Sequence, residues 1–111
     1  MLSTETIDEV LIIRVEERRL DASKAPAFKD DVGQIIDEKA NRLVLDLTLV
    51  EFIDSSGLGV IVSVLKRLGP SGNLAIAGAN STVRRLFSLT RMDRIFKLYD
   101  SPQAAVEAMQ T

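Results

Sequence analysis

The order of apolar segments along the chain is the feature that most constrains its fold. Runs of strand length, rich in β-branched and apolar residues, alternate with segments in which apolar residues recur at helical spacing. Strands are expected at residues 10–15, 43–47, 74–77 and 95–99. A helix is expected after each strand, over residues 25–36, 60–68, 83–90 and 102–109. This alternation favours a small α/β domain with a mostly parallel central sheet and about four helices packed on it.

Capping residues mark the expected ends of the helices. N-caps are expected at three serines that each precede an apolar periodic segment, namely Ser23, Ser81 and Ser101. Pro102 suits a first helical position, and Gly69 ends the second helix. The charged stretch 16–19 is expected to be a turn or an exposed edge, and residues 49–53 a short apolar connection.

The composition excludes several classes of protein. The chain has 111 residues, enough for one domain spanning 1–111, and 14 basic and 16 acidic residues give it a net charge of −2. It contains no histidine and no cysteine, so it lacks the ligands of the usual zinc, haem and iron–sulfur sites. Ser–His–Asp catalysis, Cys–His catalysis and disulfides are excluded for the same reason. We therefore expect no cofactor and no metal.

Neither a membrane segment nor an export signal is expected. No run approaches eighteen uninterrupted apolar residues, and the N-terminus lacks the basic and apolar regions of a signal peptide. The nearly balanced charge provides no general basic surface for nucleic acid or an anionic membrane. The sequence therefore predicts a soluble, cytoplasmic protein that binds a partner or uses only hydroxyl, carboxylate, Lys and Arg groups.

The unusual segment is DSSGLG at residues 54–59. It joins an apolar strand to an apolar helix, and functional sites of open α/β sheets lie where strands end and helices begin. A carboxylate and two hydroxyls stand side by side, and the two glycines would let another backbone approach closely.

Four interpretations of this loop stay open on the residues alone. The first is that Asp54, Ser55 or Ser56 only caps the helix. A phosphate-binding loop is the second, although the usual Gly-spaced loop ending in Lys and Ser or Thr is absent. The third is a serine nucleophile, which has no histidine base and only a distant Lys66. The fourth is a serine that receives a phosphoryl group, whose added charge of about −1.5 to −2 is favoured at a helix N-terminus.

The segment DLTLVEFIDSSGLGVIVSVLKRL resembles the signature of the STAS domain, the sulphate transporter and anti-sigma factor antagonist family. It is similar above all to the small stand-alone bacterial antagonists of anti-sigma factors. The resemblance spans nearly the whole chain. Supporting matches are RLD at residues 19–21, LAIAGAN at residues 74–80 and VRRLFSLTRMDRIFKLYDS at residues 83–101.

This resemblance implies a partner switch. The unphosphorylated antagonist would bind an anti-sigma factor that is also an ATP-dependent serine kinase, and so release a sigma factor. Phosphorylation of the antagonist by this kinase would end the binding, and a PP2C-type phosphatase would restore it. The chain itself would be a ligand and a substrate rather than an enzyme, without direct contact to nucleic acid or membrane. Alone it would be a monomer or a weak dimer.

The resemblance also assigns roles to residues. Ser55 would be the phosphoacceptor, with Ser56 as a minor alternative that is otherwise expected to cap the helix. Asp54 would fix the loop and add negative charge. The low-relief surface for the partner would consist of Gly57, Leu58 and Gly59. Asp21 would either lie near the loop or act as a helix-entry carboxylate.

Arg18 and Arg91 depart from the family pattern, which has glycine at both positions. Glycine at such places commonly serves a tight or left-handed backbone. If Arg18 lies near Ser55 it could pair with a phosphate; otherwise it is a solvated arginine on a turn.

Two other functions are weighed beside the anti-sigma factor antagonist. STAS domains also act in stressosome-type or other switches whose output is not a sigma factor, and as cytoplasmic parts of transporters. A small hydrolase that uses Ser55 is the remaining alternative, and it lacks a base.

Overall fold

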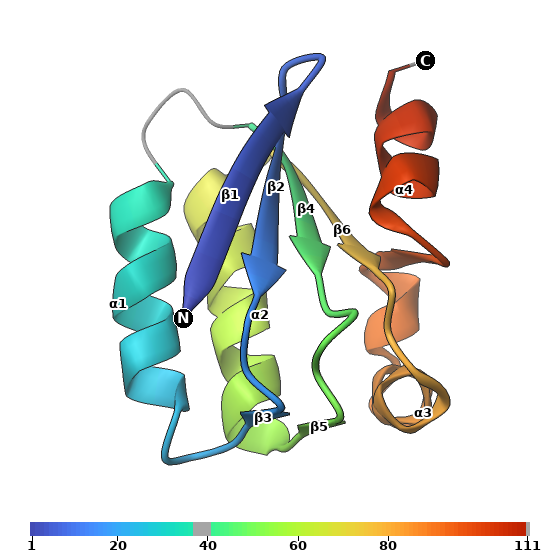
Figure 1. The fold of residues 1–111 in the computed structure, drawn as a ribbon. Helices are drawn as coiled ribbons and strands as arrows, with labels where there is room; N and C mark the ends of the chain where they lie inside the picture. Colours follow the sequence, from blue (N-terminus) through green and yellow to red (C-terminus); the bar gives the residue numbers. More distant parts are fainter. Residues whose placement is uncertain (37–40, 111) are drawn as a thin grey trace.

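The computed structural model describes residues 1–36 and 41–110 (Figure 1). Its elements are, in chain order, β1 (Leu2–Ile7), β2 (Val10–Val15), β3 (Arg19–Leu20), α1 (Ala25–Ile35), β4 (Arg42–Asp46), β5 (Phe52–Ile53), α2 (Ser55–Leu68), β6 (Asn73–Ala77), α3 (Ser81–Leu89), the 3-10 helix η1 (Met92–Arg94), β7 (Lys97–Tyr99) and α4 (Pro102–Met109).

The main sheet has five strands in the order β1-β2-β4-β6-β7. The pairs β2–β4, β4–β6 and β6–β7 are parallel, and only β1 runs antiparallel, against β2. The predicted α/β domain with a mostly parallel sheet is therefore confirmed. The strand β1 was not expected, because its residues 3–6 are exposed and polar and show no apolar alternation. Its connection to β2 places Asp8 and Glu9 at positive φ, without the Asn or Gly that usually signals such a turn.

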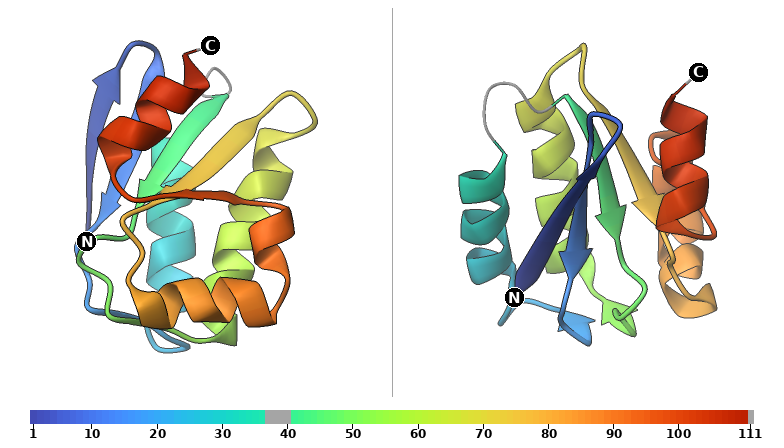
Figure 2. Two further views of the ribbon diagram at one scale, coloured as in Figure 1. Left: turned by 90° about the vertical axis from the view of Figure 1, so that its right-hand side faces the viewer. Right: turned by 45° about the horizontal axis from the view of Figure 1, so that its top comes forward.

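Helices cover both faces of this sheet (Figures 1 and 2). The larger apolar cluster lies between the sheet and the helices α1 and α2, and α3 adds Val83 and Phe87 to it. The ring of Phe87 meets Phe96 edge to face, with centroids 5.9 Å apart. On the other face α4 packs Ala105, Val106 and Met109 against the sheet. Strands β4 and β6 are buried from both sides, which explains why they are almost continuously apolar.

Several predicted helix ends differ from the structure. Lys24, not Ser23, is the N-cap residue of α1, and it makes no side-chain capping bond. Asn80, not Ser81, caps α3, because its side chain accepts a hydrogen bond from the Val83 N–H. Each of the two predicted serines lies one position away from the N-cap residue of its helix. Ser101 does cap α4, as predicted.

The expected strand over 95–99 is shorter than predicted. Residues 92–94 form η1, and only Lys97–Tyr99 pairs with β6. Ile95 is 54% exposed, so its β-branched side chain misled the prediction.

Candidate functional site

A second, two-stranded sheet positions the DSSGLG loop. Strands β3 and β5 pair in parallel, with Arg19 opposite Phe52 and Leu20 opposite Ile53. Leu20 and Ile53 are buried in the larger cluster, so this short pair is anchored to the core. The sequence predicted a turn or edge and a connection here, because strands of two residues carry no periodicity.

Asp54 is the N-cap of α2 and also ties the two short strands together. Its Oδ1 accepts hydrogen bonds from the N–H groups of Ser56 (2.9 Å) and Gly57 (3.1 Å). Its Oδ2 accepts one from the Ala22 N–H, 3.0 Å away on the segment that follows β3. The carboxylate thus satisfies two of the free N–H groups of α2 and fixes a neighbouring loop at the same time.

The two serines lie in the first turn of α2 and are exposed. The prediction that Ser56 caps the helix is wrong, because the carboxylate of Asp54 already accepts from the Ser56 and Gly57 N–H groups. Among residues 1–36 and 41–110, no hydrogen bond engages the hydroxyl of Ser55 or that of Ser56. Both hydroxyls therefore stand free at the positive end of a helix of 14 residues.

The three residues expected to form a low-relief surface do not share one environment. Gly57 is buried, and a Cβ placed on it would come within 2.2 Å of the Leu20 carbonyl oxygen. Leu58 is only 7% exposed and belongs to the core. Gly59 is exposed, and a Cβ on it would meet nothing within 4 Å. The expected surface is therefore wrong for Gly57 and Leu58, since both face inward toward β3 and the core.

Asp21 follows β3 as Asp54 follows β5. Its Oδ1 accepts from the Ser23 N–H (3.1 Å) and hydroxyl (2.7 Å), and its Oδ2 from Arg19 Nε (3.3 Å). The Ser23 hydroxyl is the main cause that lowers the pKa of Asp21, and Arg19 lowers it further. The Asp21 carboxylate thus bonds at the entry of α1, and the next residue, Ala22, donates its N–H to Asp54.

Asn80 and Arg19, to which the sequence assigned no role of their own, contact the segments next to the DSSGLG loop. Asn80 donates from Nδ2 to the carbonyl oxygens of Val50 (3.4 Å) and Glu51 (3.3 Å), so the cap of α3 also holds the segment before β5. The Arg19 guanidinium lies 4.5 Å from the centroid of the Phe52 ring. Asn is a common N-cap residue, so its place directly before a helix was a signal that could have identified Asn80. The contact of Arg19 with Phe52 follows from the pairing of β3 with β5, which the sequence does not reveal.

The two departures from the family pattern have different outcomes. Arg91 has φ 60° and ψ 20°, so the arginine adopts the left-handed conformation for which glycine is usual. Arg18 is 85% exposed, and its Nε lies 3.8 Å from a carboxylate oxygen of Glu51. It is thus an arginine on a turn whose nearest acidic partner is itself exposed.

No helix within residues 1–36 and 41–110 is long and apolar enough to cross a membrane. In that same part of the chain, no group of three or more Asp or Glu residues is arranged to hold a metal ion.

Comparison with known proteins agrees with this architecture. A Thermotoga maritima protein, named provisionally as an anti-sigma factor antagonist, is 37% identical over 112 residues, which cover 99% of this chain and 98% of that protein. The anti-sigma-F factor antagonist RsfB of Mycobacterium tuberculosis is 26% identical over 91 residues, 82% of this chain and 75% of its own. The crystal structure of an anti-sigma factor antagonist from Mycobacterium paratuberculosis superimposes with a TM-score of 0.90 at 28% identity, covering 100% of this chain and 94% of that one.

The family match extends over the sheet, the DSSGLG loop and the first half of α4. Residues 1–105 match the STAS domain. The chain therefore belongs to the STAS domain family.

Proposed function

We propose that this chain is an anti-sigma factor antagonist whose binding to an anti-sigma factor is switched off by phosphorylation of Ser55. The observation that supports the proposal is a contrast between two neighbouring side chains of the loop, those of Asp54 and Ser55. The Asp54 carboxylate is held by three N–H groups, while the neighbouring Ser55 hydroxyl is exposed and unbonded among the described residues. The names of the similar proteins support the antagonist role.

A phosphate on Ser55 would act at the surface rather than through refolding. The Ser56 and Gly57 N–H groups already donate to Asp54, so a phosphate could take them only by displacing that carboxylate. The added charge of about −1.5 to −2 would stand beside the carboxylate of Asp54. On a chain of net charge −2 this about doubles the negative charge, and like charge on a partner would then be repelled.

The anti-sigma factor would supply the catalysis. The Ser55 oxygen would attack the γ-phosphorus of ATP held by that kinase, the bond to the β-phosphate oxygen would break, and ADP would leave. A base of the kinase would take the hydroxyl proton, since the Asp54 carboxylate is committed to three backbone N–H groups. A PP2C-type phosphatase would later hydrolyse the phosphoserine and return the chain to its binding form.

The exposed residues around Ser55 would meet the partner. Ser56 and Gly59 are exposed on the first turns of α2, and Asp54 and Asp21 are half-buried beside them. Gly57 and Leu58 would contribute indirectly, by holding α2 against β3 and the core.

Phosphorylation in vitro tests the proposal. The chain is incubated with ATP and each serine kinase of the anti-sigma type from the same genome, and the modified residue is located by mass spectrometry. We expect label on Ser55 that persists in Ser56→Ala and disappears in Ser55→Ala. Label on neither serine with any of these kinases would reject the proposal.

Binding of the anti-sigma factor supplies the second readout. Ser55→Ala is expected to bind the anti-sigma factor in the presence of kinase activity and ATP, whereas Ser55→Asp is expected to bind it poorly. The reverse order of affinities would contradict the switch.

A further inference from the structure

Positive charge is concentrated in one segment of this acidic chain. Residues 81–99, which form α3, η1 and β7, contain five basic side chains and one acidic side chain. The basic residues are Arg84, Arg85, Arg91, Arg94 and Lys97, and all except Arg84 are exposed. The chain as a whole has a net charge of −2, so this segment differs in sign from the rest.

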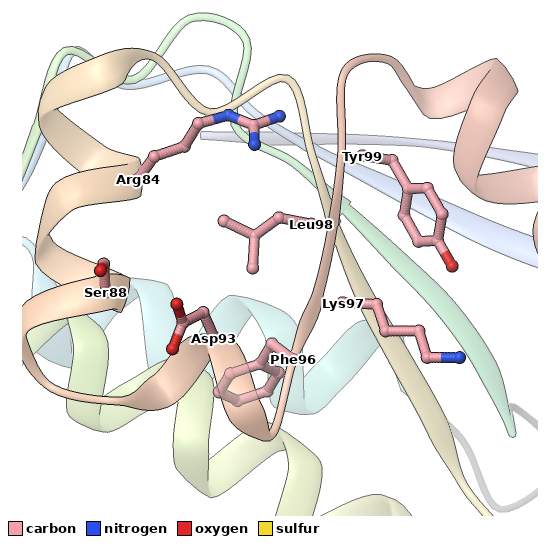
Figure 3. A pocket seen from close by; sticks show the side chains of 7 residues that line it. All are labelled: Arg84, Ser88, Asp93, Phe96, Lys97, Leu98 and Tyr99. Carbon is pink, nitrogen blue, oxygen red and sulfur yellow. The ribbon is translucent and has the colours of Figure 1, made fainter.

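A groove runs beside this segment, between α3 and β7 (Figure 3). Its volume is about 510 Å³, and its lining includes Arg84, Ser88, Asp93, Lys97, Leu98 and Tyr99. None of these residues belongs to the DSSGLG loop. The groove is therefore a second feature, separate from the proposed phosphorylation site.

The two cations of the groove differ in how they are held. Arg84 donates from Nε to the Ala79 carbonyl oxygen (3.2 Å) and from Nη2 to Asp100 Oδ1 (2.8 Å). Its carboxylate partner Asp100 is 98% exposed, so water competes for that pair. Lys97 is exposed and forms no ion pair within residues 1–36 and 41–110.

The groove also contains a free edge of the sheet. Within residues 1–36 and 41–110, strand β7 is the last strand of the sheet and pairs on one side only, with β6. The Gly78 N–H donates to the Tyr99 carbonyl (3.0 Å), so the backbone polar groups of Tyr99 point toward β6. Because residues of a parallel strand alternate in direction, the N–H and C=O of Leu98 point to the free edge.

We propose that this groove binds an extended acidic segment of another protein, which adds to the sheet along β7. The backbone of the segment would pair with the N–H and C=O of Leu98, and carboxylates at every second residue, all on one face of the added strand, would meet Lys97. The shape and the free strand edge argue for a peptide. A bilayer surface does not follow a groove, and the outward N–H and C=O of Leu98 match the backbone of an extended peptide rather than a row of phosphates.

Fluorescence anisotropy with a labelled eight-residue peptide of alternating Glu and Val tests this inference. We expect wild-type protein to bind it, and Lys97→Glu to weaken binding by about tenfold or more. Lys29→Glu, an exposed charge reversal on α1, is the matched control and should change the affinity by less than about twofold. The same peptide with alternating Lys and Val should not bind.

Strand addition is separated from charge attraction by a change in the probe alone. The Glu-Val peptide with an N-methyl group on every residue keeps its charge and loses the backbone donors of both edges, so it should lose binding. Equal binding of the methylated peptide, or equal loss in Lys97→Glu and Lys29→Glu, would overturn the inference. Binding of phosphatidylglycerol vesicles or DNA in preference to the peptide would overturn it as well. These measurements do not involve Ser55, so their outcome is independent of the proposed switch.

Discussion

Asp21 and Asp54 occupy equivalent places at the ends of the two paired short strands, but their carboxylates make different hydrogen bonds. Each directly follows one of two paired strands, because Leu20 lies opposite Ile53. The Asp21 carboxylate accepts hydrogen bonds from Ser23 and Arg19, which are both within two residues of it. Asp54 bonds to its own helix and also across to Ala22. A carboxylate that bonds to two segments, as Asp54 does, can hold one against the other, whereas the carboxylate of Asp21 stabilises the entry of a single helix.

The largest expected effect on stability comes from a substitution that pushes α2 away from β3. This would break the link that Asp54 makes between the two segments. Gly57→Ala places a Cβ within 2.2 Å of the Leu20 carbonyl oxygen, and we expect the free energy of unfolding to fall by about 2–3 kcal/mol. Gly59→Ala is the matched control in the same helix. It has open space, so it should raise the free energy of unfolding by up to about 1 kcal/mol. Urea denaturation measures both, and a neutral Gly57→Ala would show that the close approach does not exist.

Removing the carboxylate that joins the segments is expected to cost slightly less. Asp54→Ala loses the cap of α2 and the bond to Ala22, which together are worth about 2 kcal/mol. Hydrogen exchange should show faster exchange of the Ala22, Ser56 and Gly57 amides in this variant. If the Ala22 amide kept its protection, the bond across the two segments would be refuted.

A smaller effect on stability is expected at Arg91, which is remote in sequence from both Asp21 and Asp54. Arg91→Gly relieves a left-handed arginine, and we expect the free energy of unfolding to rise by about 0.5–1 kcal/mol. Arg94→Gly in the adjacent 3-10 helix has no positive φ to relieve and should not stabilise the chain. A loss of stability in Arg91→Gly would mean that the arginine side chain contributes more than its backbone costs.

The smallest effect is expected at Asp21. Its pKa is lowered in the folded state, so the ionised carboxylate stabilises the fold above its unfolded pKa of about 4, and this contribution is lost as the pH falls through the folded pKa. Asp21→Asn should therefore destabilise the chain slightly at pH 7, by less than Asp54→Ala, and the difference from wild type should shrink toward pH 3. Urea denaturation at both pH values measures it, and a difference that grows at pH 3 would contradict the assignment.

The sequence predicted the layers of this fold better than its short elements. The strands β2, β4 and β6 and the helices packed on them follow from apolar composition and periodicity, which report burial directly. The strands β3 and β5 are only two residues each, and β1 is polar, so none carries a recognisable pattern. Their existence depends on pairing with segments that are distant in sequence.

The sequence located the DSSGLG loop, but it did not predict which of its residues caps α2 or which of its glycines packs against β3. Asp54, Ser55 and Ser56 are all good N-cap residues, and only the extended backbone of Asp54, at φ −100° and ψ −175°, decides which one caps. Gly57 and Gly59 are likewise equivalent in the sequence. They differ only in where a Cβ would point, toward Leu20 for Gly57 and into open space for Gly59.

The proposed switch is tested most sharply by a titration of the anti-sigma factor with one preparation of this chain, before and after stoichiometric phosphorylation of Ser55. Calorimetry gives the affinity, and amide NMR spectra of the two forms show whether the fold has changed. We expect the affinity to fall by about a hundredfold or more while the spectral changes stay near residues 21–23 and 54–59. Unchanged affinity after phosphorylation would contradict it.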